Sequence, residues 1–360
     1  MNTNKIKLAD IIQRVSETNK ELMLTNKELV LGISIDKEFM PSVANLNGTD
    51  LSKYSVLRKN RFAYNPMHVG RDERLPIALY RSNEVALISP AYEMFEIKPD
   101  SQIDLDYLML VFKTSWFDKA CWFYTDSSVR GGLSYNDFCN IEIELPSLDE
   151  QQKLVRQYNT IVNRIDVLEK INKTLEYAIY ISIQLECVNG TKVVKVRDLI
   201  TLFDYLRKPL NDFERSSMKK TYPYYGAATL VDYVDNYLFD GEFGLLGEDG
   251  SVITDIGTPV MQYVNGKFWV NNHAHVFQGN QDYNTSFAFY ILKNIDVSSI
   301  ITGGVQGKIN QKNLLNLDVI IPKDNNKLQQ KIKTISDMIL LHQQEINQLT
   351  KLRLHLITLL

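Results

Sequence analysis

Polar side chains that can bind nucleic acid gather in short segments of this chain, next to glycine, proline and asparagine. Arginine and lysine neutralise phosphates, while arginine reads guanine and asparagine or glutamine reads adenine. In the first half the candidates are Arg58, Lys59, Arg61, Tyr64, Asn65, His68, Arg71, Arg74 and Arg130. In the second half they are Lys219, Lys220, Tyr222, Tyr224, Tyr225, Asn272, His273, His275, Gln306 and Lys308. A solvated surface role explains any single residue about equally well, so the hypothesis applies to the group.

The motifs that would make the chain an enzyme are incomplete. Residues 89–92 read Ser-Pro-Ala-Tyr, which lacks the second proline of the motif that receives a flipped adenine, and no glycine-rich cofactor loop follows a clear first strand. Residues 96–98 supply only the Glu-x-Lys half of a nuclease motif, with Asp72 as a distant acidic partner. We therefore predict no catalytic residues and no bound cofactor in this chain.

A metal site is weakly indicated by two histidines. His273 and His275 are two residues apart, so a strand would place both on one face. No cysteine, aspartate or third histidine follows at ligand spacing, and the Glu-Asp-Gly sequence at residues 248–250 is good turn chemistry. We predict no metal, and favour a structural role or a DNA contact for these residues.

The elements that must position the polar segments occur twice. Each copy has a strand-like start, a mixed region, a glycine pair, a strand that ends in proline, and a Gln-Gln-Lys sequence before a long helix. The matching segments are 6–12 and 194–200, 131–132 and 303–304, 133–146 and 309–322, and 151–153 and 329–331. Matching segments in the same order indicate a duplication of roughly half the chain.

Two long helices are expected, one from Asp149 to about Glu186 and one from about Asn326 to the end of the chain. Both lack proline and glycine, and their apolar residues alternate at spacings of three and four, as in a coiled coil. The predicted pairing residues are Leu154, Ile161, Ile165, Leu168, Leu175, Ile332, Ile335, Ile339, Ile346 and Leu349. The alternatives are two core helices of one globular domain, or a dimerisation coil.

The composition excludes few classes of function, but it indicates a cellular compartment. The formal net charge is -3, so any DNA contact must come from local patches rather than from a global basic excess. Three scattered cysteines and a polar N-terminal stretch favour a reducing cytoplasm, and no segment is long enough to span a bilayer. We expect a soluble cytoplasmic protein with no membrane partner.

Two similar units on helices of equal length suggest a caliper that holds two halves of one partner. DNA is the natural partner with regular spacing. The alternative is a non-catalytic scaffold that joins two protein partners without reading DNA sequence.

Several motifs resemble one family. The glycine pair, the strand ending in proline and the long helix look like the conserved region of type I restriction-modification specificity subunits. Segments 32–34, 49–54, 62–66 and 88–92 resemble one type of recognition domain in that family. Segments 222–226, 246–250 and 268–276 are similar to another type.

The resemblance implies an α+β fold with two duplicated mixed α/β target-recognition domains, separated by two long antiparallel coiled-coil helices. The expected parts are recognition domains at 1–148 and 188–324, and conserved helices at 149–187 and 325–360. Double-stranded DNA with a bipartite target, two modification subunits and restriction subunits are the implied partners. S-adenosylmethionine, ATP and magnesium are implied to bind to those partner subunits.

The incomplete motifs predict that the purified chain transfers no methyl group. Incubation of the chain alone with S-adenosylmethionine and DNA is expected to leave adenine unmodified, as measured by incorporation of labelled methyl groups. Clear incorporation by the pure chain would show that a catalytic site had been overlooked.

Overall fold

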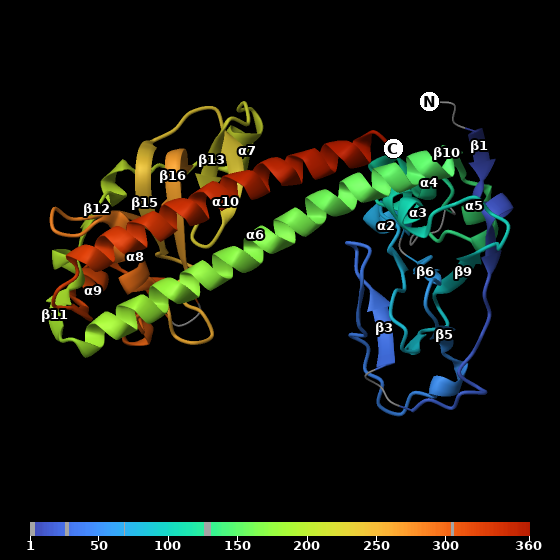
Figure 1. Cartoon of the computed structure of the whole chain (residues 1–360), viewed down its shortest axis with the longest axis horizontal. Coiled ribbons are helices and arrows are strands. Elements are labelled where there is room, and N and C mark those ends of the chain that lie inside the picture. Colours follow the sequence, from blue (N-terminus) through green and yellow to red (C-terminus); the bar gives the residue numbers. More distant parts are fainter. Residues whose placement is uncertain (1–3, 26–28, 68, 126–130, 304–305) are drawn as a thin grey trace. The chain divides into compact units, whose positions relative to one another are not determined.

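The computed structural model describes residues 4–25, 29–67, 69–125, 131–303 and 306–360. The chain divides into two compact units (Figure 1). The first unit contains residues 1–165 and 348–360, and the second contains residues 166–347. Each unit therefore includes one end of each long helix.

The first unit combines short strands with small helices. Its elements before the long helix are β1(Asn4–Lys7), α1(Leu8–Ile11), β2(Ile12–Arg14), β3(Val30–Ile33), β4(Phe39–Pro41), η2(Leu51–Lys53), β5(Ser55–Leu57), β6(Phe62–Tyr64), α2(Val69–Asp72), β7(Ile77–Leu79), β8(Ala86–Ile88), β9(Glu93–Ile97), α3(Leu105–Phe112), α4(Ser115–Phe123), α5(Tyr135–Asn140) and β10(Glu142–Leu145). Two four-stranded sheets have the orders β2-β9-β6-β7 and β4-β3-β8-β5, and β1 pairs with β10. Clustered phenylalanine rings, including Phe62, Phe95 and Phe112, fill the core between β6, β9 and α3.

The second unit is built on a larger sheet. Its elements between the long helices are β11(Thr191–Lys195), η3(Val196–Asp198), β12(Ile200–Leu202), η4(Asp204–Leu206), α7(Asp212–Ser216), β13(Tyr222–Tyr225), β14(Leu230–Val234), β15(Phe239–Gly247), β16(Met261–Val270), β17(Ala274–Gly279), α8(Thr285–Lys293), η5(Ser298–Ile300), β18(Ile301–Thr302), β19(Lys308–Ile309), α9(Gln311–Asn316) and β20(Asp318–Pro322). The six-stranded sheet has the order β12-β17-β15-β16-β13-β14, and β11 pairs with β20. The apolar residues of α8, including Phe287 and Leu292, pack into the core of this unit.

Both expected long helices are present, as α6(Leu148–Val188) and α10(Asn326–Thr358). All ten predicted pairing positions are buried or half-buried. Within the second unit, Asn172 Oδ1 and His342 Nδ1 are 2.7 Å apart, and Ile179 shares a core cluster with Ile332. A later position in α6 thus faces an earlier position in α10, so the helices are antiparallel there. The predicted fold class, with mixed α+β domains and two long helices, is confirmed.

No helix in the described ranges carries an apolar stretch long enough to cross a lipid bilayer.

The sequence repeat corresponds to a repeated scaffold. In the first unit β1 pairs antiparallel with β10, and in the second β11 pairs antiparallel with β20. The residue after each first strand donates its backbone N–H across this pair, from Leu8 to Ile141 and from Val196 to Leu317, at 3.0 Å in both cases. The two halves therefore begin and end on the same backbone arrangement.

A buried glutamine ties each long helix to the domain beside it. Gln151 in α6 accepts from the backbone N–H of Asp104, the N-cap of α3, at 2.8 Å, and its amide donates to Gln102 and Pro146 carbonyls. Gln151 and Gln329 are the first residues of the two repeated Gln-Gln pairs.

The second copy repeats this contact. Gln329 in α10 accepts from the backbone N–H of Asn284, the N-cap of α8, at 2.8 Å. Its amide donates to the Asp282 carbonyl and to Asn325 Oδ1. The same amide contact therefore joins the helix start to the domain in both halves.

The first glycine of each pair makes a close backbone contact in the left-handed region. Gly131 has φ +59°, and a Cβ built on it would lie 2.4 Å from the Cα of Gly70. Gly303 has φ +96°, and a Cβ there would lie 2.3 Å from the carbonyl oxygen of Gln306. Only glycine fits such close backbone contacts without strain. Gly304, the second member of the later pair, lies outside the described residues.

The glutamine contacts predict a paired stability result. Gln151→Ala and Gln329→Ala each leave buried backbone groups without their partner, so each is expected to lower the free energy of unfolding by about 2 kcal/mol. Urea unfolding of the full chain measures this change. The matched controls are Gln152→Ala and Gln330→Ala, at the neighbouring positions, which are expected to change it by less than about 0.5 kcal/mol. Equal losses in both members of a pair would mean that the contact is not the anchor.

Candidate nucleic-acid interface

The turn between β16 and β17 carries two of the predicted DNA-binding residues. Asn272 and His273 are both exposed, and the His273 side chain is 47% exposed. Asn271 fixes the turn locally, because its Oδ1 accepts from the backbone N–H of His273 at 2.8 Å. Such a side-chain contact two residues along is typical of asparagine in turns. The turn thus presents an amide and an imidazole to solvent from an ordered backbone.

Two further predicted residues, Gln306 and Lys308, lie beside this turn. The segment after β15 bridges them: the backbone N–H of Glu248 donates to the His273 carbonyl at 2.8 Å, and its carbonyl accepts from Ile309 at 2.9 Å. Gln306 and Lys308 are exposed. We call Asn272, His273, Gln306 and Lys308 the turn patch. Two segments far apart in sequence, linked through Glu248, therefore form one polar surface with donors and acceptors suited to base edges and phosphates.

His275 does not belong to this surface. Its side chain is fully buried, with Nδ1 at 2.6 Å from Asp204 Oδ2 and Nε2 at 2.8 Å from the Ile309 carbonyl oxygen. Burial raises the pKa of Asp204, but the hydrogen bond from His275 and the charges nearby outweigh it and lower the pKa below its usual value. The prediction of a DNA contact at His275 is wrong, because β17 is covered on both faces and its first four residues are all buried.

His275 and two carboxylates form a cluster of possible metal ligands. The spacing of these residues in the sequence did not indicate it. Ligand atoms of Asp204, Glu248 and His275 all lie within 4.8 Å of one another. The Arg207 guanidinium already pairs with both carboxylates, at 2.6 Å from Glu248 and 3.5 Å from Asp204. Both ring nitrogens of His275 are also engaged. The cluster is therefore balanced by its own cations and serves as an internal ion network.

The remaining predicted residues of the second half differ in exposure. Lys219 and Lys220 are exposed, and Lys220 pairs with Asp232 at 2.9 Å. Tyr222 and Tyr225 are half-buried.

Tyr224 is a structural residue, so the prediction of a DNA contact there is wrong. It is 1% exposed. Its hydroxyl accepts from the backbone N–H of Leu210 at 2.9 Å, and its ring lies under Arg215. Its polar tip is used inside the protein.

In the first half, two predicted arginines share one carboxylate. Arg58 and Arg61 lie 2.7 Å and 2.6 Å from the oxygens of Glu17. Hydrogen bonds from Arg58 and then Arg61 outweigh the opposing effect of burial and lower the pKa of Glu17 to about 2. The carboxylate is therefore charged at any pH near neutral, and a phosphate at this position would have to compete with it.

The other exposed candidates of the first half do not share a carboxylate. Lys59 contacts Asn83 at 2.9 Å, Arg71 pairs with its neighbour Asp72, and Arg74 is exposed. His68 and Arg130 lie outside the described residues.

Tyr64 and Asn65 follow each other in the chain but have different roles. Tyr64 is fully buried and stacks on Phe138 with ring centroids 4.5 Å apart, so the predicted DNA contact at Tyr64 is wrong. Its hydroxyl is the buried side-chain atom without a hydrogen-bond partner among the described residues. Asn65 is half-buried, and its Oδ1 accepts from the backbone N–H of Met67 at 2.9 Å. Tyr64 thus belongs to the aromatic core of the first unit.

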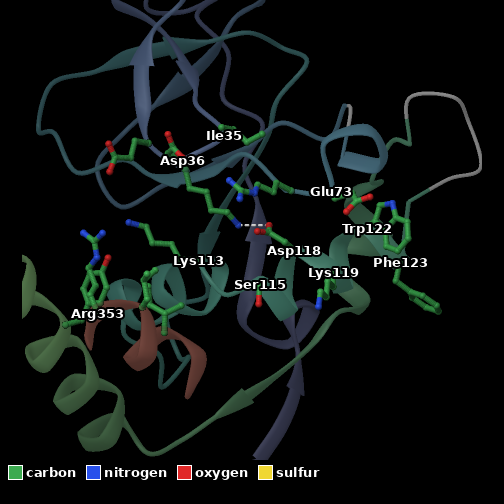
Figure 2. A pocket seen from close by; sticks show the side chains of 16 residues that line it. Ile35, Asp36, Glu73, Lys113, Ser115, Asp118, Lys119, Trp122, Phe123 and Arg353 are labelled. Carbon is green, nitrogen blue, oxygen red and sulfur yellow. Dashed lines mark hydrogen bonds and ion pairs between the residues drawn. The ribbon is translucent and has the colours of Figure 1, made fainter. Parts of the chain in front are cut away.

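A cavity of about 810 Å³ opens within the first unit, between α4, the loop before β4 and the end of α10 (Figure 2). A buried ion pair between Lys37 and Asp118, at 2.6 Å, forms part of its wall. Trp122 and Phe123 are exposed beside it. Charges of both signs line the opening, so the cavity has no clear preference for an anion.

Sequence reasoning missed the residues that support the turn patch. The role of Arg207 is not visible in the sequence, because its partners Glu248 and Ala274 are 41 and 67 residues away. The aromatic residues Tyr205 and Phe213 are strongly exposed, yet no pattern distinguished them from core aromatics.

Comparison with known proteins places this geometry in a family. Residues 59–177 and 189–351 match the model of the type I restriction modification DNA specificity domain. A Haemophilus influenzae protein named "Putative type I restriction enzyme specificity subunit S.HindORF215P" is 34% identical over 125 residues. That match covers 35% of this chain and 31% of the relative, so it spans about a third of the relative's length.

A solved structure has the same fold. The crystal structure of the type I restriction-modification system S subunit from M. genitalium aligns with a TM-score of 0.61 at 14% identity. The alignment covers 99% of this chain and 96% of that one. Because the two domain matches together span most of the sequence, the chain belongs to the type I restriction-modification DNA specificity family.

Proposed function

We propose that the chain reads a bipartite DNA target as the specificity subunit of a type I restriction-modification complex and carries out no chemistry itself. The observation that carries this proposal is a duplicated scaffold that supports different exposed residues in its two halves. A repeated scaffold with identical surfaces would bind two copies of one half-site. Divergent surfaces suit two different half-targets.

The two halves also differ inside the domains, at matching positions of the strands that follow the scaffold. The N–H of Lys98 donates to Ile11, and the N–H of Asn280 donates to Leu199, so β9 and β17 occupy matching places. Counting back along these strands, Glu93 in the first half matches His275 in the second.

The matching positions carry different chemistry. Glu93 binds Arg14 at 2.7 Å near the surface, whereas His275 binds Asp204 in the interior. The same backbone frame therefore supports different polar networks, as expected of two domains that read different bases.

The turn patch supports the assignment of DNA as the partner of the second domain. Asn272 and Gln306 offer the paired donor and acceptor that adenine requires, and Lys308 offers a cation to phosphate. A net charge of -3 over the whole chain makes such local surfaces the expected sites of contact.

The partners are proposed from the family alone. We propose that the long helices dock two modification subunits, which carry S-adenosylmethionine, and that restriction subunits with ATP and magnesium join that assembly. The domain boundaries at 148 and 188, and at 324, remain proposals of the same kind. So does a cytoplasmic location, where such DNA would be met.

Substitutions in the turn patch are expected to separate sequence preference from affinity for DNA of any sequence. Asn272→Ala and His273→Ala should reduce the preference for the cognate target by about tenfold each, because each removes a base-edge contact. Lys308→Ala should weaken binding to all sequences and reduce the salt dependence of affinity by about one counterion. Titration of the chain, assembled with its modification subunit, onto cognate and altered duplexes at several salt concentrations measures both. Unselective binding by the unaltered complex would favour the protein-scaffold alternative instead.

Tyr64→Phe is a control in the first domain, at a predicted DNA-binding residue that the structure places in the core. It removes a buried hydroxyl without a partner among the described residues, so the free energy of unfolding should stay the same or rise by up to about 1 kcal/mol. DNA selectivity should not change. A loss of selectivity at unchanged stability would restore Tyr64 to the DNA-binding surface.

A further inference from the structure

The backbone of the turn patch is held at three consecutive carbonyls. Arg207 Nη1 donates to the Ala274 carbonyl at 2.7 Å and to the Asn272 carbonyl at 3.4 Å. Between them, the His273 carbonyl accepts from the backbone N–H of Glu248 at 2.8 Å. The turn is thus anchored from the protein side, while the side chains of Asn272 and His273 remain exposed.

We infer that Arg207 is a positioning residue, which fixes the turn so that Asn272 and His273 meet DNA in one geometry. This inference rests on the proposed function of the turn patch and names the residue on which its selectivity depends. Arg207 itself is largely buried, with its side chain 11% exposed, so it acts through the turn rather than by touching DNA.

Arg207 is immobilised by its own partners. Its Nη1 lies 2.6 Å from Glu248 Oε2, and its Nε donates to the Asp204 carbonyl at 3.1 Å. Asp204 is held in turn, because its carboxylate binds His275 and accepts from the backbone N–H of Val276 at 2.8 Å. The ion network therefore fixes the guanidinium, and the guanidinium fixes the turn.

Only arginine suits this position. A guanidinium is planar and directs several N–H donors along fixed lines, so it serves Glu248 and the turn carbonyls together. A lysine ammonium at residue 207 would keep the charge for Glu248 and lose the fixed geometry toward the Asn272 and Ala274 carbonyls. A binding surface held within a fraction of an ångström discriminates better than one that must be ordered on contact.

The test compares Arg207→Lys with Arg215→Lys in the full chain, assembled with its modification subunit. Arg215 is a matched control, because it is similarly buried in the same unit and bonds to carboxylates and to the Leu210 carbonyl, but supports Tyr224 instead of the turn. The affinity ratio between the cognate target and targets altered in one half-site is measured for each variant. Hydrogen exchange is followed in the peptides that contain His273 and Glu248.

Arg207→Lys is expected to reduce discrimination in one half-site by about tenfold and leave the other half-site unchanged. Exchange at the His273 and Glu248 amides should become faster, while Arg215→Lys changes neither the turn exchange nor the discrimination. Unchanged discrimination in Arg207→Lys would overturn the inference, and so would an equal loss in Arg215→Lys. If the unaltered complex showed no sequence preference, the proposed function would fail, and the exchange rates would decide the positioning by Arg207 separately.

Discussion

A buried amide contact fixes each long helix to its neighbouring domain, and the exposed loops extend from that joint. Gln151 and Gln329 each bind the backbone N–H of an N-cap residue, at the start of α3 and α8. A buried amide is costly to leave without partners, so its position is strongly determined. The orientation of each domain on its own helix end therefore follows from a few hydrogen bonds that occur twice.

On this fixed frame the two halves differ where they meet solvent. The first half has Arg58 and Arg61 paired with Glu17, while the second has the turn patch held by Arg207. The scaffold contacts occur in both halves, whereas the exposed loops differ between them. Under the proposed function, a change of DNA target would need new loop residues and new supporting residues such as Arg207, on the same scaffold.

The long helices and the duplication could be predicted from the sequence. The helices followed from their apolar spacing, and the duplication followed from matched segments, since both patterns can be read along the linear sequence without knowledge of the fold. The direction of single side chains was not predictable: Tyr64, Tyr224 and His275 share polar tips with Asn272 and His273, yet all three are buried. Burial depends on what covers the strand, and β6 and β17 are covered on both faces by elements that are distant in sequence.

We propose that each half of the chain reads its own half of one DNA target. The most direct measurement replaces residues 188–324 with the matching domain of a relative and sequences the methylated sites in cells that also express the modification subunits. If the two halves read DNA independently, the methylated motif will contain one new half-sequence and one unchanged half-sequence. A motif in which both halves change together, or in which neither does, would contradict this proposal.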